Sequence, residues 1–152
     1  MGGDGNFVGG SVNTVVGSAN GVNGNYNTVQ GNYNGLKGSG NYVLGGANGV
    51  QGDLNAIGNG YYNTIGGSQN IVSNGNYNGV LGNANFVQGS ANLVHGNTNA
   101  IVGNTNAVSG GANLVFGSDN TVLSDDGCFL PPPPPPPPTN PTAPCQVCQV
   151  CE

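Results

Sequence analysis

The residues of this chain that could do chemistry are few, and the most reactive lie near its carboxyl end. Four cysteines are candidates for covalent or metal chemistry: Cys128, Cys145, Cys148 and Cys151. Thiols spaced in this way form disulfides, bind zinc as a Cys₄ set or hold an iron–sulfur cluster. We favour disulfides, because no helix or knuckle turn is encoded around Cys-x-x-Cys-x-x-Cys to shape a metal site. Polyproline II has three residues per turn, so in that conformation Cys145, Cys148 and Cys151 would form one line. Cysteines on one line cannot easily all pair with each other, so some of these disulfides are expected to link two chains.

The other titratable side chains form no catalytic pattern. His95 is the single histidine, and its repeat contains no cysteine or paired carboxylate, so we interpret it as a surface side chain rather than a metal ligand or a base. The six acidic residues are too dispersed for a carboxylate dyad or a calcium-binding repeat. No glycine-rich stretch leads into the Lys-Ser/Thr pair of a phosphate loop. We therefore expect a protein that is not an enzyme and has no cofactor.

Charge and hydropathy exclude further classes. With one lysine, no arginine and a formal net charge of -5, the chain has no basic patch for nucleic acid. No apolar run approaches the roughly 20 residues that a membrane-spanning helix needs. The first residues lack the basic and apolar segments of a signal peptide. The cysteines nevertheless favour an oxidising location, and we predict an extracellular or cell-surface protein.

The dominant pattern is a seven-residue unit, Gly-x-x-Asn-x-Val-x, repeated between Asn6 and Leu123. Asn and Val are two residues apart, so on a strand both side chains point to the same side. Glycine then supplies a corner, because it tolerates positive φ. Two units complete one coil of about 14 residues, with Val in a thin core and Asn amides bonding in a ladder from coil to coil. The pattern predicts an all-β fold, a β-solenoid over residues 1–124, followed by a separate segment at 125–152.

Two units are one residue longer than the others. The spacing from Asn55 to Asn63 is eight residues, and so is the spacing from Asn70 to Asn78. We interpret Gly58-Asn59-Gly60 and Ser73-Asn74-Gly75 as corner bulges that leave the core register unchanged. We expect the two bulges on different edges of the coil.

The repeat resembles that of the grass ice-recrystallisation-inhibition (antifreeze) proteins, x-x-Asn-x-Val-x-Gly; the segments 24–31 and 117–122 carry the similarity clearly, and it covers nearly all of residues 6–123. More distantly, the chain is similar to the head repeats of trimeric autotransporter adhesins, which have Gly-x-x-Ser-x-Ala. The resemblance implies a left-handed β-roll with coils of 14–15 residues. The grass family also implies ice binding on a flat outward face.

Two functions follow from the outward side chains. One outward face is unusually apolar, and we predict that it mediates self-association of a structural subunit in an extracellular filament, fibril or surface layer. The expected assembly residues are Tyr42, Leu44, Ile71, Phe86, Val102, Leu114 and Phe116. The alternative is ice binding or inhibition of ice recrystallisation, for which Thr14 and Thr28 are the candidate residues.

The segment after the repeat has a different composition. An unbroken proline run is expected to form a polyproline II rod, and Cys-Gln-Val then repeats with period three. No Asn-x-Ser/Thr acceptor site with a permitted middle residue is present, because the residue two positions after each repeat Asn is aliphatic. O-linked glycans on the tail remain a prediction. The candidate positions are Pro131, Pro132, Pro133, Pro134, Pro135, Pro136, Pro137, Pro138, Thr139 and Thr142.

Overall fold

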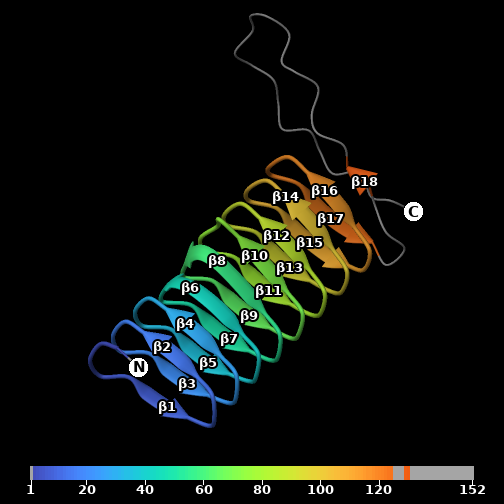
Figure 1. The fold of residues 1–152 in the computed structure, drawn as a ribbon. Helices are drawn as coiled ribbons and strands as arrows, with labels where there is room; N and C mark the ends of the chain where they lie inside the picture. Colours follow the sequence, from blue (N-terminus) through green and yellow to red (C-terminus); the bar gives the residue numbers. More distant parts are fainter. Residues whose placement is uncertain (1, 125–128, 131–152) are drawn as a thin grey trace, which may run out of the picture.

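The chain winds into a flattened β-solenoid in the computed structural model, which describes residues 2–124 and 129–130 (Figure 1). Two nine-stranded parallel sheets lie face to face, and successive strands alternate between them. The described residues contain strands and turns without a helix. The predicted all-β solenoid is confirmed, with partner residues 14 positions apart in most coils. The left-handedness implied by the resemblance stays a prediction.

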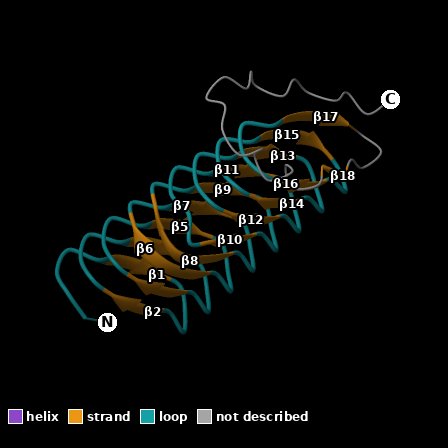
Figure 2. Ribbon diagram, turned by 90° about the horizontal axis from the view of Figure 1, so that it is seen from above, coloured by secondary structure: helices purple, strands orange, loops and turns teal. Residues whose placement is uncertain are grey.

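The two sheets are named here by the numbers of their strands. The odd sheet contains β1 (Phe7–Gly9), β3 (Gly21–Asn23), β5 (Gly35–Lys37), β7 (Gly49–Gln51), β9 (Thr64–Gly66), β11 (Gly79–Leu81), β13 (Leu93–His95), β15 (Ala107–Gly110) and β17 (Thr121–Ser124). The even sheet contains β2 (Thr14–Val16), β4 (Thr28–Gln30), β6 (Tyr42–Gly46), β8 (Ala56–Tyr61), β10 (Ile71–Ser73), β12 (Phe86–Gln88), β14 (Ala100–Val102), β16 (Leu114–Phe116) and β18 (Phe129–Leu130). Figure 2 shows the strands in orange and the connecting corners in teal.

The core is one column of aliphatic side chains on each sheet. The central residue of each three-residue strand points inward, as the sequence pattern predicts, and is almost fully buried except in β1, where Val8 is partly buried. Parallel pairing places it over the equivalent residue of the neighbouring coil, as in Val72 over Ile57 and under Val87. Each buried aliphatic side chain removes apolar surface from water and stabilises the fold by about 1.5–3 kcal/mol before conformational entropy is counted.

The buried asparagines satisfy every polar atom that they bring into the interior. Asn63 Nδ2 donates to Asn48 Oδ1 at 3.1 Å and to the Gly75 carbonyl at 2.9 Å. Asn63 Oδ1 accepts from the backbone N–H and the Nδ2 of Asn78, both at 3.0 Å. The predicted amide ladder is confirmed, and each amide also ties a glycine corner to the core. No buried side-chain nitrogen or oxygen of the described residues lacks a hydrogen-bond partner.

Each corner uses two residues with positive φ. The first is usually the repeat glycine, as in Gly67 with φ 120°, and the second is the residue directly before the repeat Asn. That second position accepts large side chains, such as Leu54 at φ 58° and Tyr62 at φ 58°. A left-handed conformation costs a non-glycine residue about 1–2 kcal/mol. The surrounding hydrogen bonds, for example Tyr62 N–H to the Gly46 carbonyl at 3.2 Å, hold this backbone in place.

The two long units both lie on one edge of the roll, so the expectation of different edges is wrong. Asn59 lies within even strand β8 and Asn74 directly follows even strand β10, and they take up the extra residue with φ 52° and 49°. Asn74 N–H donates to the Gly58 carbonyl at 2.9 Å, which stacks one bulge on the other. The core register is unchanged across both, because Ile57 pairs with Val72 across the first bulge and Val72 pairs with Val87 across the second. The error has a simple cause: the two long units are separated by one unit, so they belong to the same sheet.

The even sheet continues beyond the last odd strand. Phe129 pairs with Leu114, and Leu130 pairs with Val115, so β18 adds a final strand to the even sheet. The predicted proline rod, the O-glycosylation candidates and the four cysteines lie outside the described residues.

Candidate functional site

The outer face of the even sheet carries two ranks of side chains that run along the roll. The residues before and after each buried aliphatic residue point outward, and parallel pairing aligns them from coil to coil. All seven predicted assembly residues lie in these ranks, on β6, β10, β12, β14 and β16. The first rank reads Thr14, Thr28, Tyr42, Ala56, Ile71, Phe86, Ala100 and Leu114, and the second reads Val16, Gln30, Leu44, Gly58, Ser73, Gln88, Val102 and Phe116.

The predicted apolar strip is interrupted on this face. Tyr42 pairs with Ala56, and Ala56 pairs with Ile71, so a coil with small side chains separates the aromatic residue from the next bulky one. Phe86 in turn pairs with Ala100. The large apolar residues therefore form three groups rather than one continuous stripe.

Thr14 and Thr28 lie side by side. The pairing of β2 with β4 places Thr14 directly opposite Thr28, and Thr28 pairs with Tyr42 on its other side. The neighbouring strand spacing of a sheet, about 4.8 Å, therefore separates the two threonines. The rank of threonines ends there, since Tyr42 occupies the next coil.

The outer face of the odd sheet differs in charge and relief. Gly21, Gly35 and Gly49 occupy successive coils and form the floor of a shallow trough with a volume of about 510 Å³. Lys37 lies on its rim, and His95 points outward further along the same sheet. His95 is thus a surface side chain, as the sequence indicates. The even ranks contain no charged residue, so the two faces are chemically distinct.

The edge at which each odd strand leads to an even strand carries a continuous polar ladder. The backbone N–H of Ser11 donates to Asn25 Oδ1 at 2.8 Å, and the N–H of Asn25 donates to Ser39 Oγ at 3.2 Å. Side-chain oxygens of Asp53 and Ser68 continue the pattern. This ladder was not expected from the sequence, although the Ser, Asn or Asp directly after most corner glycines is the signal that could have predicted it.

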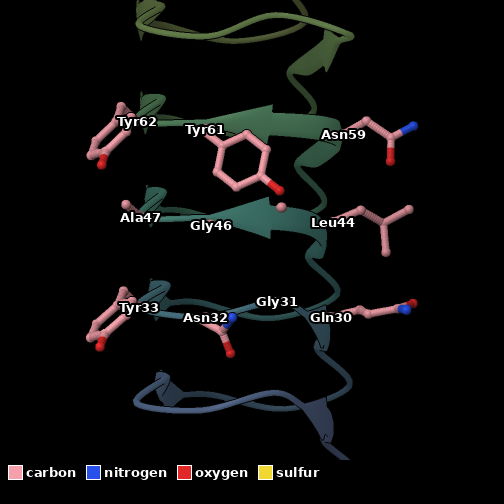
Figure 3. A pocket seen from close by; sticks show the side chains of 11 residues that line it. Gln30, Gly31, Asn32, Tyr33, Leu44, Gly46, Ala47, Asn59, Tyr61 and Tyr62 are labelled. Atoms are coloured by element: carbon pink, nitrogen blue, oxygen red, sulfur yellow. The ribbon is translucent and has the colours of Figure 1, made fainter.

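The opposite edge, where even strands lead to odd strands, has a gap in its ladder. Gly46 occupies the position that Ser or Asn fills in most other coils, and Ala47 follows it. Asn32 and Tyr33 lie on one side of this pair, and Tyr61 and Tyr62 lie on the other (Figure 3). The missing side chains leave a notch with a volume of about 520 Å³. We call it the edge notch; sequence reasoning did not predict it.

The comparison with protein families decides the assignment. Residues 36–129, which run from β5 to β18, match the family described as grass antifreeze beta roll. The chain belongs to the grass antifreeze β-roll family. The resemblance recognised from the repeat is thereby confirmed, while a search of curated proteins gave no match. Thr14 and Thr28 lie in coils that precede the matched region of this antifreeze roll.

The antifreeze roll offers no metal-ligand cluster among its described residues, since no three His, Cys, Asp or Glu side chains gather there. No described helix is long and apolar enough to cross a membrane. The expectations of disulfides among Cys128, Cys145, Cys148 and Cys151 fall outside the described residues.

Proposed function

We propose that the protein binds ice through the outer face of the even sheet and inhibits ice recrystallisation outside the cell. The observation that carries this proposal is membership of the grass antifreeze β-roll family over residues 36–129. Ice binding was the alternative function predicted from the sequence. The family supports it better than the filament interpretation, for which the comparison gives no support.

Rigidity favours this function. An ice plane is a regular array of water molecules, so a protein that adsorbs to it must hold its contact groups at fixed spacing. Here the core asparagines and the strand pairs lock each coil to the next; Thr14 N–H, for example, donates to the Asn27 carbonyl at 2.8 Å. The outward ranks are thus held without flexible loops.

Charge selects the even face over the odd face. Charged groups hold their hydration shells strongly, and removing that water has a high free-energy cost. The even ranks are free of charge, and they alternate apolar residues with Thr, Ser and Gln. The odd face carries Lys37 and His95 and is hollowed by its glycine trough. The even face is therefore the better candidate for adsorption to a neutral, flat crystal.

Thr14 and Thr28 contribute the most regular part of this surface. Each presents a methyl group and a hydroxyl group, and the β2–β4 register aligns the two residues. A lysine at either position would add a charge and a long flexible chain to the face.

The test is ice-recrystallisation inhibition by micromolar, monomeric protein. We expect Thr14→Lys and Thr28→Lys to reduce inhibition, whereas Thr64→Lys and Thr121→Lys should have little effect. The control threonines hold the same position in their strands, but they belong to the odd sheet and are exposed. No inhibition by the folded wild-type monomer would refute the proposal. An equal loss of inhibition in the even-sheet pair of variants and in the odd-sheet pair would refute the choice of the even face.

A further inference from the structure

The edge notch lies between two tyrosines that point in the same direction. Tyr33, Ala47, Tyr62 and Tyr77 occupy the same corner position in four successive coils, each with φ between 54° and 60°. Tyr62 and Tyr77 are in adjacent coils and stack, with ring centroids 5.1 Å apart and an interplanar angle of 6°. Ala47 has no ring, so Tyr33 and Tyr62 are separated by one vacant ring position (Figure 3).

The width of this vacant position limits what fits. Tyr33 and Tyr62 are two coils apart, and twice the observed stacking distance gives a separation of about 10 Å. A planar aromatic ring in contact with both tyrosines needs only about 7 Å, because carbon atoms touch at about 3.5 Å. A saturated six-membered ring is thicker, since its axial C–H bonds project from both faces. The centroid separation therefore leaves room for a pyranose ring between the two tyrosines.

Polar groups line the notch beside the vacant position and at its far end. Asn32 Oδ1 accepts from the Ser18 N–H at 2.7 Å, and its Nδ2 is directed toward the coil of Gly46 (Figure 3). Tyr61 lies over Gly46, and its hydroxyl group is directed toward the side of Leu44; a Cβ at Gly46 would approach the Tyr61 ring to 3.2 Å. The amides of Gln30 and Asn59 line the far end of the notch, opposite the tyrosines Tyr33 and Tyr62 (Figure 3). These side chains can both donate to and accept from sugar hydroxyl groups.

The lack of positive charge excludes ring-containing ligands that carry an anionic group. The notch is lined by uncharged residues only, and the whole chain has a single lysine and a net charge of -5. A nucleotide would bring a phosphate that nothing here neutralises. A neutral, hydroxyl-rich ring meets both the stacking surfaces and the amides.

We propose that the edge notch is a binding site for a neutral saccharide, with one pyranose ring held between Tyr33 and Tyr62. The C–H faces of the sugar pack on the two phenol rings, which are 73% and 57% exposed in the free protein. Asn32 binds a hydroxyl group of this ring, and the rest of an oligosaccharide extends across Gly46 toward Tyr61 and into solvent. The two stacking tyrosines lie outside the proposed ice-binding ranks, whereas Gln30 and Leu44 border both the notch and the second rank.

The test uses isothermal titration calorimetry of the full chain with cellohexaose, xylohexaose and mannohexaose. We expect at least one of them to bind with a Kd of about 1 mM or tighter. Tyr33→Ala and Tyr62→Ala should each weaken binding at least ~10-fold, since each removes one stacking surface. Tyr26→Ala is the matched control, because Tyr26 has the same corner conformation on the opposite edge. This variant should bind the oligosaccharide with the same affinity as the wild-type protein.

Ala47→Tyr is the decisive variant, because it fills the vacant position with a residue that the fold already accepts there. Tyr33 and Tyr62 have nearly the same φ as Ala47, so the variant should fold with an unchanged or higher melting temperature. We expect it to abolish saccharide binding and to retain ice-recrystallisation inhibition, which separates this proposal from the ice-binding one. Binding by Ala47→Tyr equal to wild type would overturn the proposal. So would the absence of binding to all three oligosaccharides, or binding of indole in their place.

Discussion

The inward and outward sides of the same strands follow opposite rules. Inward, every coil repeats the residue types of the one before it, with an Asn amide and an aliphatic side chain stacked on their equivalents. Outward, adjacent coils differ freely, from Gly to Phe at equivalent positions. The repeat therefore accounts for the stability of the fold, and under the proposed function ice recognition would depend on the residues that do not repeat. The same kind of substitution should therefore change the unfolding free energy much more at an inward position than at an outward one.

Val72→Asp is expected to have the largest effect. Val72 is fully buried between Ile57 and Val87, and a carboxylate there would lie in a dry column without a partner. The loss of unfolding free energy should exceed about 4 kcal/mol, enough to prevent folding. Ile71→Asp is the matched control, since Ile71 precedes Val72 on the same strand but is 46% exposed. Circular dichroism should show a β spectrum for the control only; equal spectra would make the inward assignment wrong.

Asn63→Ala should cost about 3–4 kcal/mol. The substitution removes four hydrogen bonds and leaves the buried N–H of Asn78 without its acceptor. Asn23→Ala changes an exposed asparagine on the outer odd face and should alter the unfolding free energy by less than about 0.5 kcal/mol. Urea denaturation measures both. A small loss in Asn63→Ala would mean that the amide ladder contributes little.

Gly67→Ala should cost about 2–3 kcal/mol. Gly67 has φ 120°, and a Cβ there would collide with the Gly82 carbonyl oxygen of the next coil. Gly21→Ala provides the comparison, because Gly21 lies on the outer odd face with open space around its Cα. Thermal melts should separate the two variants by several degrees. Equal melting temperatures for the two variants would show that the corner geometry does not require glycine at position 67.

Leu54→Asn should have the smallest effect on the unfolding free energy, and it should stabilise the fold rather than destabilise it. Leu54 is exposed and has φ 58°, a conformation that Asn adopts at lower cost, as Asn59 and Asn74 do here. We expect a gain of about 0.5 kcal/mol in unfolding free energy, measured by urea denaturation. A loss instead would show that the Leu54 side chain itself stabilises its corner.

The sequence predicts the inward side well and the outward side poorly, for a physical reason. One rule, that residues two apart on a strand share a side, assigns the buried Val, the buried Asn and the outward ranks. Counting the units also suffices to place Asn59 and Asn74 on one edge, so that error was avoidable. The edge notch is different, because it depends on Gly46 and Ala47 meeting tyrosines of two other coils. No single repeat contains that information; it exists only once the coils are stacked.

The most direct test of ice binding through the even face is the uptake of folded monomer into a slowly growing ice crystal. Ala100→Lys and Ala107→Lys are the matched variants: both replace a partly buried alanine at the same strand position, one on even β14 and one on odd β15, within the region shared with the family. Wild type and Ala107→Lys should be enriched in the ice, and Ala100→Lys should remain in the liquid. Exclusion of the wild-type protein from the ice, or enrichment of Ala100→Lys equal to that of Ala107→Lys, would contradict the account.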